Sequence, residues 1–299
     1  MAQGDIILPT ERLHELPAVR TITLVDLRDA LAKGVDDFWA MPTHVIFLSL
    51  IYPIVGIALG SATFGYDVVP LLFPLAAGFA LIGPFAAIGL YELSRRREQG
   101  LDTSWRHAFD IIHSPSIWSI AAVGLLLLAI FAVWLAVANA IYVANFGGEA
   151  PTTPVTFARN VLTTSQGHKL IIVGNAVGFL FALVAFALSV VSFPLLLDRH
   201  VGAAVAIITS IRVVLANPLV MASWGLFVAG ALVIGSLPFL IGLALVMPVL
   251  GHSSWHLYRK VVEPDPSPRP EFHPRRKGRR YGADLPVSLF VPSKPGDEP

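Results

Sequence analysis

The chain has 299 residues, of which 55% are hydrophobic and 14% charged, and its mean hydropathy is +0.69. Ordinary soluble domains carry roughly 25% charged residues, so this composition excludes a typical soluble enzyme and predicts a protein that crosses a membrane several times. The absence of cysteine excludes disulfides, thiolate metal sites and cysteine nucleophiles.

Residues 1–20 are polar and contain Pro9 and Pro17, which is typical of a flexible leader. They lack the basic start, apolar run and cleavage site of a secretory signal. From Thr23, apolar residues between Leu24 and Phe38 recur at helical spacing with charged residues between them. This pattern predicts an amphipathic helix lying on the membrane surface.

Long uncharged stretches predict transmembrane helices. About 24 residues separate Asp67 from Glu92, enough at 1.5 Å each to cross a ~30 Å hydrocarbon core. The uncharged region from Val213 to Tyr258 would reach about 69 Å as one helix, so we expect it to fold back near 235–238. The alternative is one kinked span followed by a long interfacial helix. The six predicted spans are 45–62, 69–93, 117–143, 170–197, 219–236 and 238–258.

Prolines recur in an order that indicates an internal repeat. Each unit has an amphipathic segment, a proline at the start of a span, a second span, and a proline near the end of that second span. The three starting prolines are Pro42, Pro115 and Pro218, and the three later ones are Pro84, Pro194 and Pro248. We therefore predict an all-α transmembrane bundle of three pseudo-repeated helical hairpins with amphipathic interfacial helices, over residues 21–260. Residues 261–299 are rich in proline and basic residues, and we expect an extended tail.

The distribution of Lys and Arg predicts the orientation. With six spans, Arg159 and Lys169 lie on one side and all other cations near the spans lie on the opposite side. Because cytoplasmic loops are rich in Lys and Arg, we expect both termini in the cytoplasm and 152–165 on the opposite side of the membrane. The connection over 144–169 is the longest polar one, and its role is open.

Two aromatic residues are each followed four positions later by an arginine: Tyr91 by Arg95, and Trp255 by Arg259. An aromatic ring followed by cations is typical of an anchor at a membrane face that carries anionic lipid. The predicted membrane-interface anchors are Tyr91, Arg95, Arg96, Arg97, Trp255 and Arg259. We expect the arginines to hold the first hairpin in register and not to bind a substrate.

Paired glycines four residues apart predict close helix packing at Gly56 with Gly60 and at Gly174 with Gly178. Asn139 and Asn175 are each expected to form a hydrogen bond between helices, with a role as a substrate ligand as the alternative. No residue is assigned to catalysis or to a cofactor.

His252 and His256 are four apart and share one helical face, the spacing that metal-binding helices use. Without an identifiable third ligand they are weak metal candidates, and a structural role is the preferred interpretation.

Four segments resemble an uncharacterised family of bacterial integral membrane proteins, domain of unknown function 2189. They are VDLRDALAKGVDDFWAMP, GPFAAIGLYELSRRREQG, MPVLGHSSWHLYR and RRYGADLPVSLF, and the resemblance covers residues 20–292. It implies a multi-span inner-membrane protein and supplies no activity. Members of this group are sometimes labelled as cytochrome c oxidase subunits, but this chain lacks the histidines deep within helices that a haem–copper catalytic subunit needs.

Taken together, these features predict a non-enzymatic structural or accessory membrane component, with a respiratory complex as one setting. The alternative is a membrane carrier for a neutral or apolar solute, because no predicted span holds an ionisable group at its centre. The expected partners are anionic lipids at the cytoplasmic face and another membrane protein or a second copy of the chain. We expect no nucleic acid.

Overall fold

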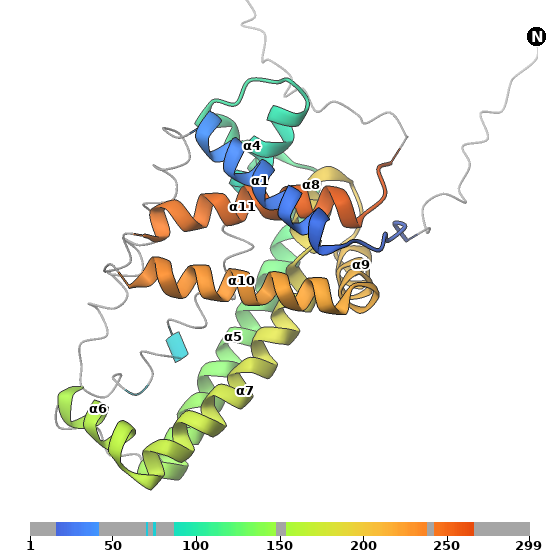
Figure 1. Ribbon diagram of the computed structural model, residues 1–299. Helices are drawn as coiled ribbons and strands as arrows, with labels where there is room; N and C mark the ends of the chain where they lie inside the picture. Colours follow the sequence, from blue (N-terminus) through green and yellow to red (C-terminus); the bar gives the residue numbers. More distant parts are fainter. Residues whose placement is uncertain are drawn as a thin grey trace, which may run out of the picture. The chain divides into compact units, whose positions relative to one another are not determined.

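The computed structural model describes residues 16–41, 70, 74–75, 87–147, 154–237 and 242–265 (Figure 1). These residues are helical and form no named strand, with one isolated β-bridge between Val19 and Val262. The helices are α1 (Leu24–Ala40), α4 (Ile88–Glu98), the 3-10 helix η3 (Trp105–His113), α5 (Ile117–Phe146), α6 (Pro154–Thr163), α7 (Ser165–Ser189), α8 (Ser192–Asp198), α9 (Ala203–Ala216), α10 (Pro218–Ser236) and α11 (Leu243–Val261). The all-α prediction is confirmed for this part of the chain.

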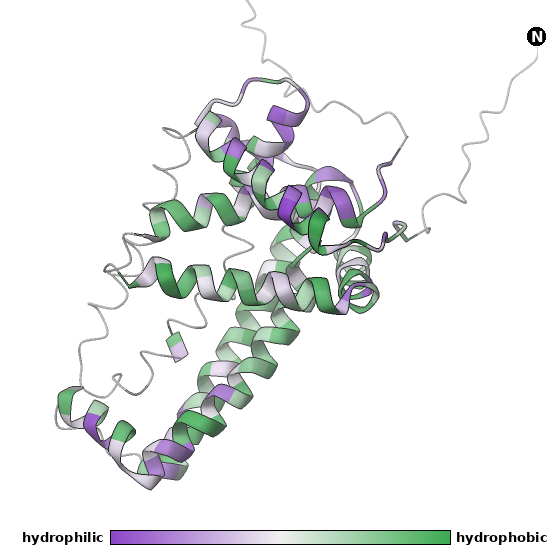
Figure 2. Ribbon diagram, viewed as in Figure 1, coloured by the Kyte–Doolittle hydropathy of each residue, from purple (hydrophilic) through white to green (hydrophobic). Residues whose placement is uncertain are grey.

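Three helices are long and apolar enough to cross a membrane: Ile117–Phe146, Ser165–Asp198, which includes α8, and Pro218–Ser236. They fall on the third, fourth and fifth predicted spans. In Figure 2, α5, α7 and α10 are hydrophobic along most of their length, whereas α1 and α4 carry more hydrophilic residues. The protein is therefore an integral membrane protein with several apolar helices.

The six-span count and the pseudo-repeat are not established by these helices. The first predicted span and most of the second, including Gly56 and Gly60, lie outside the described residues. Helix α11 occupies the position of the sixth, but it is not among the three apolar helices. Its second half carries the buried polar residues His252 and Ser253, which lower its hydropathy.

Helices α10 and α11 lie side by side (Figure 1), so the last apolar region folds back as expected. Gly235 and Gly242 meet where they approach each other. A Cβ on Gly242 would come within 2.7 Å of the Gly235 carbonyl oxygen, a distance that no side chain tolerates. The glycines therefore permit the close approach of the two backbones.

Helix α1 begins with a capping box: Thr23 Oγ1 accepts from the Asp26 amide, and the Thr23 amide donates 2.9 Å to Asp26 Oδ2. The predicted helix is confirmed, but its buried face was not foreseen. Ala30, Gly34 and Asp37 are buried, and the most extensive helix contact in the described part of the chain is between α1 and α11.

Helix α6 was not predicted, because the polar composition of 144–169 indicated a connection without secondary structure. The segment is a short amphipathic helix. Phe157 and Val161 are four apart and line one cavity together with α7 residues, which the helical period allows. α6 lies at the end of α5 that carries Tyr142, whose ring lies 6.0 Å from that of Phe157.

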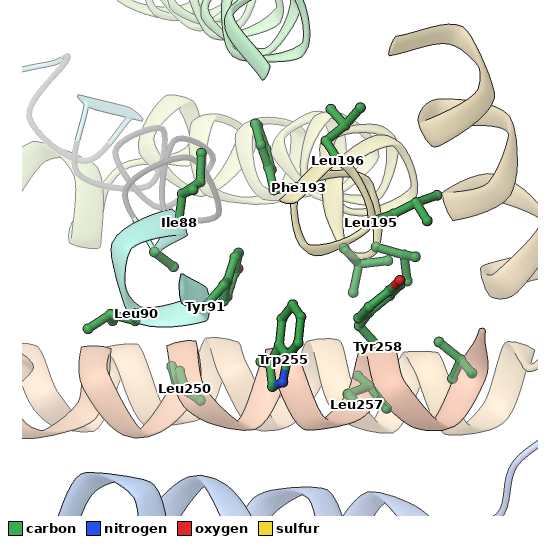
Figure 3. Packing of buried hydrophobic residues seen from close by; sticks show 14 of the residues in the cluster. Ile88, Leu90, Tyr91, Phe193, Leu195, Leu196, Leu250, Trp255, Leu257 and Tyr258 are labelled. Carbon is green, nitrogen blue, oxygen red and sulfur yellow. The ribbon is translucent and has the colours of Figure 1, made fainter. Parts of the chain in front are cut away.

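The central core forms where α4, α8 and α11 meet. Figure 3 shows Tyr91, Phe193 and Trp255 pointing from these three helices into one packed region. Phe193 and Trp255 have no exposed surface, and Tyr91 is 3% exposed. This core holds together the helix ends that carry the charged residues described next.

Candidate functional site

A group of buried polar residues that touch one another comes from α1, α4 and α11. We call them the Asp37 cluster, which comprises Asp37, Ser94, Arg97, His252 and His256. Asp37, Ser94 and His252 are at most 3% exposed, so their hydrogen bonds must come from the protein. The three helices are distant in the sequence, and the cluster forms only when they pack.

Asp37 is the centre of the cluster. Ser94 Oγ donates to Asp37 Oδ2 over 2.6 Å, and His256 Nε2 lies 2.9 Å from the same oxygen. The Arg97 guanidinium pairs with Asp37 Oδ1. His252 Nδ1 lies 2.6 Å from Ser94 Oγ and 3.8 Å from Asp37 Oδ2. One carboxylate thus receives hydrogen bonds from α4 and α11 while lying on α1.

These contacts fix the proton on His252. A hydroxyl has one hydrogen, and that of Ser94 points to Asp37, so Ser94 Oγ accepts from His252 Nδ1. Neutral His252 therefore carries its proton on Nδ1. Its Nε2 is a buried acceptor without a hydrogen-bond partner among the described residues. Hydrogen bonds are thus donated in one direction, from His252 to Ser94 and from Ser94 to Asp37.

Burial alone would raise the pKa of Asp37, because it disfavours the charged carboxylate. Hydrogen bonds from His256, Ser94 and Arg97 outweigh burial and lower its pKa to about 2. Asp37 is therefore ionised at neutral pH, and the positive charge of Arg97 balances it.

The cluster contains the residue types of a hydrolytic triad, but its geometry does not fit that chemistry. A nucleophilic serine donates its hydrogen to histidine, whereas Ser94 donates to Asp37 and is 1% exposed. No group of three or more His, Cys, Asp or Glu in the described part of the chain is arranged to hold a metal ion. His252 and His256 both face the Asp37 carboxylate, which comes from another helix and which their spacing did not identify.

The three arginines of the Arg95–Arg97 triplet have different hydrogen-bond partners, although Arg96 also lies 3.7 Å from Glu92. Arg95 forms two hydrogen bonds of 2.7 Å with the Glu92 carboxylate, which is 4% exposed. Arg96 Nε donates to the Asp102 carbonyl over 2.6 Å, and Arg97 pairs with the Asp37 cluster. The triplet therefore ties α4 to the following loop and to α1.

Arg259 has an equivalent arrangement on α11. It lies 2.9 Å from Glu98 of α4 and 3.7 Å from Asp198 of α8. Trp255 Nε1 donates to Glu98 over 3.0 Å, and Tyr258 donates to Asp198 over 2.7 Å. The ends of α4, α8 and α11 are thus joined by polar contacts as well as by the core.

The predicted aromatic anchors lie inside the protein. Tyr91 is 3% exposed and Trp255 is fully buried, so their rings pack on protein side chains. Anchoring to lipid stays a prediction for the cations beside them. The structure adds carboxylate partners that the sequence did not identify, namely Glu92 for Arg95 and Glu98 for Arg259.

Of the glycine pair on α7, Gly178 lies against a neighbouring helix: a Cβ there would approach Trp134 Cη2 of α5 to 2.9 Å. Around Gly174 there is open space, with nothing within 4 Å of its Cβ position. Asn175 donates 2.7 Å to the Ile171 carbonyl of its own helix, and not to another helix.

Residues 72–198 match the family model described as predicted integral membrane protein (DUF2189). This stretch is similar to the DUF2189 family. The match supports the family that the motif over 83–100 suggested, and it includes the arginine triplet with α5 and α7. The DUF2189 match does not extend to α1 or α11, which complete the Asp37 cluster. The chain has no match among curated proteins or solved structures.

Proposed function

We propose that the chain is a non-enzymatic structural or accessory component of a bacterial inner membrane, packing with another membrane protein or a second copy of itself. The main support is that buried charged side chains in the described part of the chain form ion pairs with one another. Arg95 pairs with Glu92, Arg97 with Asp37. A catalytic or ion-binding site keeps polar groups for its substrate, whereas Arg95 and Glu92 pair within α4, and Arg97 and Asp37 join α4 to α1.

Helix α10 offers the surface best suited to a partner. Its large residues Leu219, Leu226 and Val233 are seven apart and 82%, 76% and 61% exposed. Smaller residues lie between them, and Gly230 has nothing within 4 Å of its Cβ position. Large and small residues alternating along one face allow another transmembrane helix to approach closely.

A photo-crosslinking amino acid at Leu226 tests this role in cells. We expect an adduct with one protein of defined mass, and Gly230→Leu should abolish it by filling the face of α10. The same amino acid at Leu125, which is 64% exposed on α5, should give lipid adducts only. Lipid adducts alone at both positions would disprove the packing role. Mass spectrometry of the partner then decides between a respiratory complex, another membrane protein and self-association.

A carrier for a neutral or apolar solute is the second candidate, favoured by an apolar cavity beside α5 and α7. Purified protein in liposomes would have to accelerate the flux of such a solute. Failure to do so, with a stable Leu226 adduct, leaves the structural role.

A further inference from the structure

A cavity of about 290 Å³ lies between α5, α6 and α7. Helix α5 contributes Trp134, Ala138, Ile141 and Tyr142, α6 contributes Phe157 and Val161, and α7 contributes Leu170, Ile171, Gly174 and Asn175; Pro70 and Pro74 complete the lining. The volume is near the lower limit of ligand pockets, roughly 300 Å³. It has room for one chain or one ring, and not for a whole lipid.

The lining residues that the structure describes include no acidic or basic side chain, and two of their polar donors already have partners. Trp134 Nε1 donates 3.0 Å to the Pro74 carbonyl, and Asn175 Nδ2 donates to the Ile171 carbonyl. An ion would lose its hydration here without gaining a partner, and water would find few hydrogen bonds. The lining therefore favours an uncharged hydrocarbon occupant.

Gly174 gives the cavity its depth. One turn further along α7, Gly178 packs on the Trp134 ring, which closes the cavity on that side. At Gly174 a side chain would point into unfilled space, since nothing lies within 4 Å of its Cβ position. A larger residue there would occupy the cavity without displacing protein atoms.

The cavity borders the bilayer. Helices α5 and α7 are both apolar enough to span it, and Ile171, at the edge of the cavity, is 37% exposed. Hydrocarbon chains of membrane lipids surround such helices and reach this opening without crossing a polar layer. We propose that the cavity binds one acyl chain of a bilayer lipid, held by the Trp134, Tyr142 and Phe157 rings.

Photolabelling of the purified full-length protein in liposomes tests this site. The liposomes contain a phosphatidylcholine with a diazirine on one acyl chain, and adducts are mapped by mass spectrometry. We expect adducts at Phe157 and Val161. Gly174→Leu should lower their yield by roughly fivefold or more, because a packed interior leaves no room for a second occupant. Gly202→Leu is the matched control, since Gly202 is equally open but does not line the cavity.

A second arm uses a free diazirine-bearing long-chain alcohol in unlabelled liposomes. Labelling by the alcohol without labelling by the lipid would overturn the proposal and favour a free solute as the ligand. Lipid adducts that are equally abundant in both variants would also overturn it, because they would arise outside the cavity. If Gly174→Leu does not fold, Val161→Phe fills the same cavity from α6. These measurements do not involve Leu226, so this site and the packing role fail independently.

Discussion

Gly34 of α1 lies against Ser253 of α11 with no room for a methyl group between the helices. A Cβ on Gly34 would approach the Ser253 amide nitrogen to 2.6 Å and its Cα to 2.7 Å. Both helices also contribute to the Asp37 cluster. Asp37 lies three residues after Gly34 on α1, and His252 lies one residue before Ser253 on α11. The close approach of the two backbones is therefore a precondition for the buried polar contacts.

We expect Gly34→Ala to destabilise the protein by about 1–3 kcal/mol, the usual cost of overpacking. Ser253→Gly should not rescue it, because the clash also involves backbone atoms of residue 253. Thermal unfolding in detergent measures both variants, with Gly202→Ala as the control in open space. Full rescue by Ser253→Gly would show that the serine side chain, and not the backbone, sets the helix distance.

Substitutions in the arginine triplet should differ in how much they destabilise the protein, whereas lipid anchoring alone would give equal effects. Arg97→Gln should destabilise more than Arg96→Gln, since it leaves the 4% exposed Asp37 carboxylate without its cation, at a cost of about 3 kcal/mol. Adding Asp37→Asn to Arg97→Gln should recover part of the loss. Unfolding temperatures of the three variants and the unchanged protein in one detergent measure this, and equal effects of Arg96→Gln and Arg97→Gln would favour anchoring to anionic lipid instead.

The pKa of Asp37 predicts a loss of stability in acid. Its ordinary value is 3.8 and its folded value is about 2, so the folded state favours the ionised form. The resulting stabilisation, about 2 kcal/mol, is complete above pH 4 and is lost as the pH falls toward 2. Unfolding temperatures between pH 5 and pH 2 should fall less steeply for Asp37→Asn than for the unchanged protein. Parallel curves would mean that other carboxylates dominate the acid response.

Hydropathy predicted these transmembrane helices because a run of apolar residues within one continuous segment is enough to indicate a span. The predicted span 117–143 corresponds to α5, which continues to Phe146 and ends at Gly147, whose φ of +78° suits only a residue without a Cβ. The predicted span 170–197 begins earlier, at Ser165, because Thr164 caps the helix by accepting from the Gly167 amide. It is interrupted between Ser189 and Ser192.

The Asp37 cluster could not be predicted in the same way. Ser94 and Asp37 are 57 positions apart, and Ser94 and His252 are 158 apart, so no spacing rule connects them. Helical periodicity placed the apolar side of α1 against a membrane, yet the side that carries Gly34 and Asp37 packs on α11. A charged residue three positions after a glycine on a predicted helix is a weak signal, because most charged residues face solvent.

The orientation of the chain in the membrane is testable with single cysteines, since the natural sequence has none. Val25 on α1 and Val155 on α6 are 76% and 79% exposed, so a cysteine at either position should be equally reactive. The distribution of Lys and Arg predicts α1 on the cytoplasmic side and α6 outside. A membrane-impermeant maleimide added to intact spheroplasts should therefore label Val155→Cys, and should label Val25→Cys only after lysis. Labelling of both before lysis would place α1 and α6 on the same side and refute an odd number of spans between them.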